Sequence, residues 1–250
     1  MNRLSRLVAA GFLLLASSNG NATVLDIDFN GTQLLLGTFE SAQTGTEFYN
    51  YDTDFTTSAG PRYPGTSDFI PLQNDALQIF AHIDTTTDRL SFGVILEKPL
   101  GSGGGSFNAD VAISAPAQLA FVDDPPIYDP NTSPVGTTGN IVIDLDWSDC
   151  CTDGFVISDF DPEDLFIDLT NITGSDLTQV IFLSPDRNNT VFDFPTDVFN
   201  ISIRPCDPDT DPNGCVIPSV PVPAAFWLFA SVLAGWLGFG RKLNSQPTRS

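Results

Sequence analysis

Apolar and polar residues alternate along most of this chain, in short runs separated by turn-forming residues. In residues 141–147, four apolar side chains fall on one side of an extended chain and two aspartates on the other. Because successive side chains of a strand point to opposite faces of a sheet, this period of two predicts half-buried β-strands. Nearly every gap between such runs holds Gly, Pro, Asn or Asp, which are residues that form turns.

The alternating runs predict an all-β fold, as a single antiparallel β-sandwich or jelly-roll-like domain. Asn30 and Gly31 are expected to turn the first two strands into a hairpin. No run before Pro223 has the spacing of an amphipathic helix of three turns. The expected strands are residues 24–29, 33–39, 77–83, 90–96, 107–113, 118–122, 141–147, 155–160, 165–169, 177–183, 190–194 and 198–203.

Two connecting segments have a distinctive composition. Residues 101–106 contain only glycine and serine and are expected to be a flexible connector. They lack a following Lys-Ser or Lys-Thr pair, so they do not have the pattern of a phosphate-binding loop. Residues 123–139 are rich in proline and are expected to form an exposed excursion.

Charge is distributed very unevenly along the chain. Residues 23–218 carry all 31 acidic residues but only five of the ten basic ones, which gives them a formal charge of −26. A field of this sign repels nucleic acid and anionic lipid, so we expect no nucleic-acid partner. The length of this part fits one domain, and the chain's 20 phenylalanines supply apolar surface for a core. Residues 23–218 are therefore expected to form one β-sandwich ectodomain.

Residues 1–22 have the three parts of a secretory signal peptide. Arg3 and Arg6 precede a short apolar run at residues 7–16, and small and polar residues follow up to Ala22. This order is typical of a signal that is cleaved after export, here after Ala22. An uncleaved membrane anchor is the alternative, and the shortness of the apolar run disfavours it.

The other end of the chain, residues 220–243, also has the composition of a signal. A proline-containing motif leads into an uninterrupted apolar stretch at residues 224–240, and a basic pair follows. A stretch of this kind is expected to form one transmembrane helix, with the basic pair on the cytoplasmic side. The motif consists of Val220, Pro221, Val222, Pro223 and Ala224, and the basic pair is Arg241 and Lys242.

The two terminal segments together resemble those of exosortase-sorted proteins of Gram-negative bacteria, the PEP-CTERM type, in its VPLPA-like variant. The resemblance implies recognition by an exosortase-type processing enzyme at an inner-membrane intermediate, and delivery to the cell surface or extracellular matrix. Two features depart from the family pattern, since the motif lacks Glu and residues 243–250 extend past the basic pair. A plain single-span anchor is the alternative, and the resemblance carries no information about residues 23–218.

An acidic segment before the C-terminal signal places oxygen-bearing residues at alternate positions. The candidate ligands are Asp207, Asp209, Asp211 and Asn213, and Gly214 follows them. This spacing is similar to the first half of the calcium loops of EF-hand, dockerin and thrombospondin type 3 modules. Val220 stands at the twelfth position, so the bidentate Glu is missing. A calcium site and a proline-stiffened acidic loop both remain open. Residues 26–31 show the same spacing, but alternation there favours a strand with a turn.

Four cysteines allow three complete disulfide pairings, and export favours their oxidation. A bond between Cys206 and Cys215 closes a short loop and is expected to contribute about 2–3 kcal/mol. It leaves Cys150 and Cys151 as chain neighbours, whose direct bond requires a strained turn. Pairing of these two with Cys206 and Cys215 therefore remains the alternative.

Residues that indicate catalysis are scarce. His82 is the only histidine, and its apolar strand pattern favours a structural role over that of a base. The G-x-S-x-G and H-E-x-x-H motifs are absent, so we expect no enzyme. The alternative is a lectin-like module that binds an extracellular polysaccharide, with Tyr49, Tyr51, Tyr63 and Tyr128 exposed for stacking on sugar. An extracellular hydrolase is the second alternative.

Overall fold

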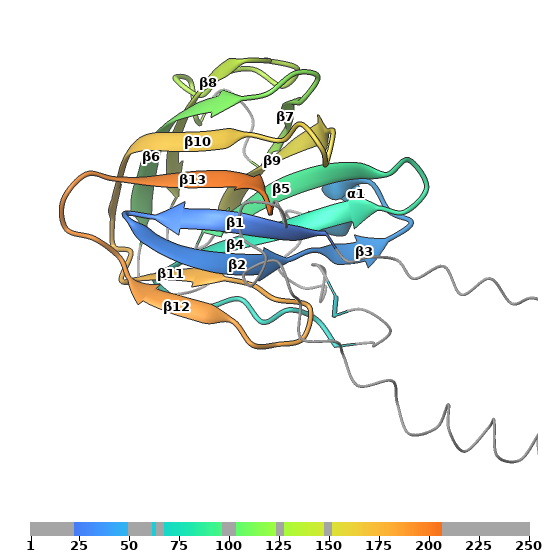
Figure 1. Cartoon of the computed structure of the whole chain (residues 1–250). Helices are drawn as coiled ribbons and strands as arrows, with labels where there is room; N and C mark the ends of the chain where they lie inside the picture. Colours follow the sequence, from blue (N-terminus) through green and yellow to red (C-terminus); the bar gives the residue numbers. More distant parts are fainter. Residues whose placement is uncertain are drawn as a thin grey trace, which may run out of the picture.

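The computed structural model describes residues 23–49, 62–63, 68–96, 104–123, 128–147 and 152–206. Within these residues, thirteen strands form two β-sheets, and residues 45–49 form one short helix (Figure 1). The predicted all-β class is therefore confirmed. The predicted signals at residues 1–22 and 220–243 lie outside the described residues, and the described part contains no helix long and apolar enough to span a membrane.

Sheet A has the strand order β2-β1-β13-β10-β6-β8, and sheet B has the order β12-β11-β4-β5-β9-β7, with β3 added beside β4. The strands of sheet A are β1 (Val24–Phe29), β2 (Thr32–Gly37), β6 (Gly105–Ile113), β8 (Asn140–Trp147), β10 (Ile167–Ser175) and β13 (Phe199–Pro205). Those of sheet B are β3 (Phe39–Ser41), β4 (Ala76–Asp84), β5 (Arg89–Leu96), β7 (Gln118–Val122), β9 (Asp153–Phe160), β11 (Gln179–Phe182) and β12 (Thr190–Asp193), and the helix is α1 (Gly45–Tyr49).

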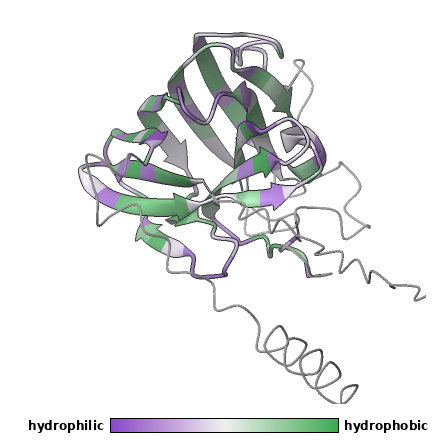
Figure 2. Ribbon diagram, turned by 45° about the vertical axis from the view of Figure 1, so that its right-hand side comes forward, coloured by the Kyte–Doolittle hydropathy of each residue, from purple (hydrophilic) through white to green (hydrophobic). Residues whose placement is uncertain are grey.

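The main core contains apolar side chains from both sheets. On β1, Leu25, Ile27 and Phe29 are buried, while the residues between them are partly exposed. β8 alternates in the same way, as its sequence predicted. Figure 2 shows this alternation as hydrophobic and hydrophilic bands along the strands. Sheet A therefore has one core face and one polar face, which is the usual arrangement for an antiparallel sheet.

Sheet B is covered on both faces. Every residue of β4 is buried, and so are seven of the eight residues of β5. One face contributes to the main core, and the other belongs to a second cluster that includes Phe48, Tyr49, Tyr63 and Phe80. The prediction of half-buried strands is wrong for β4 and β5, because α1 and residues near Tyr63 cover the face that alternation assigned to solvent.

The short helix α1 is held by a reciprocal cap. Thr44 Oγ1 accepts a hydrogen bond from Glu47 N at 3.3 Å, and Glu47 Oε2 accepts one from Thr44 N at 2.8 Å. These bonds satisfy donors that a helix N-terminus leaves free, and the bond that the carboxylate accepts from Thr44 N is the main cause of the lowered pKa of Glu47. The cap orients Phe48 and Tyr49 toward sheet B, where both are buried.

Most of residues 128–139 are exposed, as expected, but the segment lies along the sheets instead of projecting from them. Thr132 Oγ1 donates to Asp144 O at 2.7 Å and accepts from Asp144 N at 2.8 Å, so its side chain takes the place of a neighbouring strand beside β8. Further along, Thr137 O accepts a bond from Leu119 N of β7 at 2.9 Å. This segment therefore covers the outer edge of sheet A at β8 and pairs with the outer strand of sheet B.

Two further features depart from the simple antiparallel prediction. β3 and β11 both run parallel to β4 and pair with successive stretches of it. β6 begins at Gly105, so the last two residues of the expected glycine-rich connector belong to a strand. The backbone of Gly105 lies against the Trp147 ring. The predicted hairpin at Asn30 and Gly31 is confirmed, with φ values of 50° and 86°.

Candidate functional site

An open cavity lies at the end of the sandwich where the described body begins. Its volume is about 970 Å³. The walls come from β3, the turn between β4 and β5, and the connection from β9 to β10, which are far apart in the sequence. They are formed by Thr23, Glu40, Ile83, Thr85, Thr87, Asp88, Arg89, Asp161, Pro162 and Glu163.

The cavity carries an excess of negative charge. Among its described lining residues, four are acidic, Glu40, Asp88, Asp161 and Glu163, and one is basic, Arg89. Arg89 Nη1 lies 3.7 Å from Asp161 Oδ2, and both side chains are nearly half exposed, so this ion pair adds little stability. Carboxylates, threonine hydroxyls and a guanidinium together suit a ligand rich in hydroxyl or ammonium groups.

The turn between β4 and β5 is shaped by Asp84. Its Oδ1 accepts a hydrogen bond from Thr86 N at 2.8 Å, and its Oδ2 accepts one from the Thr87 hydroxyl at 2.9 Å. The Thr86 bond is the main reason why the pKa of Asp84 lies below its usual value. Because Asp84 stays ionised and bonded, it holds the turn that supplies Thr85 and Thr87 to the cavity wall.

His82 lies on β4, beneath α1, and its side chain is completely buried. Its Nε2 is 2.8 Å from Ser41 Oγ, and its ring stacks on Phe48 with centroids 4.3 Å apart. Nδ1 has no hydrogen-bond partner in the described part of the chain. Burial lowers the pKa of His82 to about 4, against a smaller opposing effect of Asp84. A neutral, enclosed and weakly basic imidazole fits the structural role that its strand pattern predicted.

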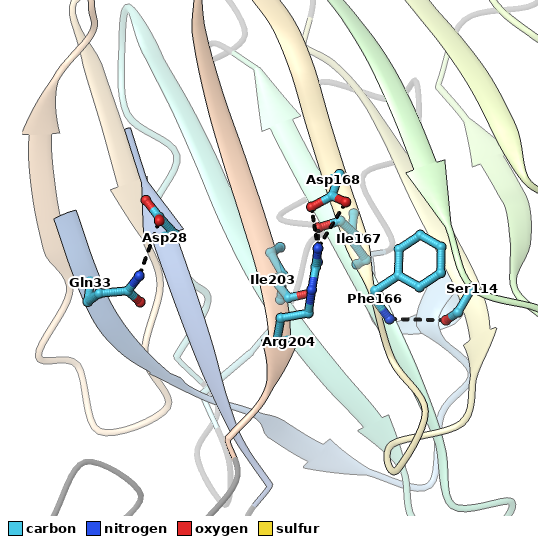
Figure 3. Close-up of polar contacts among 8 residues, drawn as sticks. All are labelled: Asp28, Gln33, Ser114, Phe166, Ile167, Asp168, Ile203 and Arg204. Carbon is cyan, nitrogen blue, oxygen red and sulfur yellow. Dashed lines mark hydrogen bonds and ion pairs between the residues drawn. The ribbon is translucent and has the colours of Figure 1, made fainter. Parts of the chain in front are cut away.

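The polar face of sheet A carries a second set of charged groups, shown in Figure 3. Arg204 Nη2 on β13 donates to both carboxylate oxygens of Asp168 on β10, at 2.7 and 2.9 Å. Arg204 Nη1 donates to the carbonyls of Ile167 and Ile203. The guanidinium is thus occupied by groups of its own sheet, which makes this face a weaker candidate for ligand binding than the cavity.

The tyrosines do not form the platform that the lectin-like alternative expected. Tyr49 and Tyr63 are only 1% and 7% exposed, so neither can stack on a sugar. Arg187 covers the Tyr63 ring at 4.4 Å. Tyr128 is 63% exposed, and Tyr51 lies outside the described residues. The expectation of exposure is wrong for Tyr49 and Tyr63 because the second core cluster uses their rings.

Most of the predicted site residues lie outside the described residues. These are the candidate calcium ligands Asp207, Asp209, Asp211 and Asn213, the motif Val220, Pro221, Val222, Pro223 and Ala224, the pair Arg241 and Lys242, and the cysteines Cys150, Cys151 and Cys215. Cys206, the last described residue, takes part in a disulfide bond. Its partner lies outside the described residues, so the pairing with Cys215 stays a prediction.

Residues 26–31 form a strand and a turn, as alternation favoured over a calcium loop. Asp28 Oδ1 accepts a bond from Gly31 N at 2.6 Å, and its Oδ2 accepts one from Gln33 Nε2 at 3.1 Å (Figure 3). No group of three or more His, Cys, Asp or Glu side chains in the described ranges is arranged to hold a metal ion.

Sequence reasoning missed the cavity and the Arg204–Asp168 pair. Both depend on which strands and loops become neighbours, and alternation within a strand carries no information on that point. The one available signal was the rarity of basic residues in so acidic a chain, which singles out Arg89 and Arg204. Comparison with known proteins found no matching family model, no similar curated protein and no similar solved structure.

Proposed function

We propose that this chain is an exported, non-catalytic protein of the cell surface or extracellular matrix of a Gram-negative bacterium. The observation that carries the proposal is the order of features in residues 220–243: a proline motif, an apolar span and a basic pair. The span holds an intermediate in the inner membrane, and an exosortase-type enzyme acts at the motif. The acidic body is then presented outside the cell.

The geometry of the body is compatible with processing at both ends. β1 and β13, the first and last described strands, are neighbours inside sheet A. Cys206 N donates to Val24 O at 3.0 Å, so the chain enters and leaves the sandwich at the same end. Cleavage before Thr23 or after Cys206 therefore removes no described strand. A body whose two ends leave together also suits attachment at one end.

We also propose that the sandwich is jelly-roll-like. From β5 to β11 the chain alternates between the sheets, with β6, β8 and β10 in sheet A and β7 and β9 in sheet B. Repeated crossing between two antiparallel-rich sheets is the connectivity that distinguishes jelly rolls from simple meanders.

The sorting proposal is tested by following the protein in its host with and without the exosortase-type enzyme. Deletion of the enzyme is expected to leave the unprocessed C-terminus in the membrane fraction. A Pro221→Ala, Pro223→Ala double variant should do the same in the intact host. Pro218→Ala, just before the motif, is the matched control and should be processed normally. Release that is unchanged in the deletion strain contradicts the proposal.

The cavity favours a second candidate function, the binding of an extracellular polysaccharide. Its threonines, carboxylates and Arg89 offer the hydrogen-bonding groups that fix polar ligands in a site. We expect a glycan array to show binding that Arg89→Ala or Glu163→Gln abolishes. Arg187→Ala, which alters an exposed arginine outside the cavity, is the control. Binding that survives both cavity changes rules out this site.

A further inference from the structure

The outer strands of the two sheets differ in how their edges are protected. Thr132 covers β8 through two hydrogen bonds, and Thr137 pairs with β7 through Leu119. β12 ends in a charged residue, Asp193. β2 carries no charge and pairs only with β1 among the described residues, and Ser184 and Pro185 lie near it only at its last residue, Gly37. Uncovered edges without charge or proline are the ones that accept another strand.

The register of the β1–β2 hairpin identifies the free backbone groups of β2. The two-residue turn pairs Phe29 with Thr32, so alternate residues from Thr32 onward bond to β1. The amide and carbonyl groups of Gln33, Leu35 and Gly37 therefore point away from β1. Within the described residues, no hydrogen bond reaches these backbone groups. They form three donor and acceptor positions in a row along an open edge.

We propose that β2 is an assembly edge, at which a second copy of this chain adds its own β2 in antiparallel register. A two-fold axis at Leu35 places this residue opposite its equivalent, and Gln33 opposite Gly37 of the second copy. Two-fold pairing of one patch with itself is the commonest way in which copies of a chain associate. The arrangement joins two copies of sheet A into one continuous sheet.

Charge favours a second copy as the occupant of this edge. The chain has a formal net charge of −21, so most of its surface repels another copy. β2 reads Thr-Gln-Leu-Leu-Leu-Gly and brings no like charges together across the seam. Leu35 is 40% exposed and gains an apolar cross-strand partner. The carboxylates of Asp26 and Asp28 belong to β1, one strand back from the seam.

Sedimentation equilibrium of the full-length chain in detergent, over a range of concentrations, tests the proposal. Self-association is expected, and Leu35→Glu should weaken it by about tenfold or more, because like charges directly opposite repel. Leu35→Pro should weaken it as well, since it removes an amide at the free edge only. Val191→Glu, at an exposed site on β12, is the matched control and should associate like the wild type. The C-terminal segment is common to all variants, so differences between them report on β2.

Amide hydrogen exchange supplies a second measurement that does not depend on any substitution. Exchange at Leu35 and Gly37 is expected to slow as the concentration of the wild-type chain rises, while exchange at Val191 stays constant. A chain that is monomeric at all concentrations overturns the proposal. So does equal weakening by Val191→Glu, or exchange at Leu35 that is independent of concentration. Unchanged melting temperatures at low concentration show that the variants are folded.

Discussion

His82 links the stability of the fold to pH through a single buried ring. Burial between neighbours that include Ser41 and Phe48 favours the neutral imidazole, and no described group forms a hydrogen bond with Nδ1. An unfolded chain exposes the same ring to water, where it takes up a proton near pH 6.5. The difference between these two states gives a measurable dependence of stability on pH.

We expect the chain to lose stability as the pH falls from 6.5 toward 4. The folded pKa of His82 is about 4 and the unfolded value is near 6.5, so the unfolded state binds the proton first. The stability that the neutral ring provides is complete above pH 6.5, and the loss reaches about 3 kcal/mol near pH 4. Thermal melts between pH 4 and 8 measure it. His82→Gln should flatten this part of the profile, and identical profiles for both proteins contradict the assignment.

Gly93 provides a prediction about packing at one residue. A methyl group at this position would overlap the ring of Phe80, which is itself completely buried. Gly93→Ala is therefore expected to destabilise the fold by about 1–3 kcal/mol through overpacking. Gly37→Ala is the control, because its methyl group would lie at an ordinary 3.5 Å from Pro185. Denaturant unfolding of both variants checks the prediction, which is wrong if their midpoints agree.

At the scale of elements, the segment at residues 128–139 takes the place of a missing neighbour beside β8. Asp129 adds to the bonds of Thr132, since its Oδ1 accepts a hydrogen bond from Asp146 N at 3.1 Å. Side chains thus satisfy backbone groups that a further strand would otherwise pair. This protection explains why β8 presents a closed edge, whereas β2 at the opposite end of sheet A does not.

Removal of the Thr132 hydroxyl should open the edge of β8. Thr132→Val keeps the shape of the side chain but leaves the amide and carbonyl of Asp144 without this partner. We expect a loss of about 1–3 kcal/mol and faster exchange of the Asp144 amide. Thr137→Val, which removes one local bond to Pro134 O, is the control. Slow Asp144 exchange in Thr132→Val shows that another group protects the edge.

At the scale of the whole molecule, the dominant property is the formal net charge of −21. Self-repulsion of the folded body should weaken as salt screens it, so added NaCl is expected to raise the melting temperature. If residues 207–213 bind calcium, CaCl2 at equal ionic strength should raise it further, and EDTA should reverse that increment. Asp209→Asn with Asp211→Asn should abolish the increment and leave the NaCl effect in place. Equal melting temperatures in the two salts remove the calcium site.

Much of the strand pattern could be predicted from the sequence, because alternation is a local property. β8 lies at residues 140–147 where 141–147 were expected, and the hairpin at Asn30 and Gly31 has the predicted turn. The prediction was wrong where long-range packing covers a second face, as at Phe80, or an edge, as at Thr132. The cavity could not be predicted, since its walls combine loops that only the folded chain brings together.

The sequence by itself determined the all-β class, the strong negative charge and the two terminal segments on which the proposed export depends. Each of these follows from residue types and their order, and a strand alternates in this way whatever its neighbours are. Only the tertiary structure decided that His82 is enclosed beside Ser41, that Arg204 is bonded to Asp168, and that β2 keeps an open edge. The physical reason is that burial, ion pairing and edge protection are properties of contacts between residues distant in the chain.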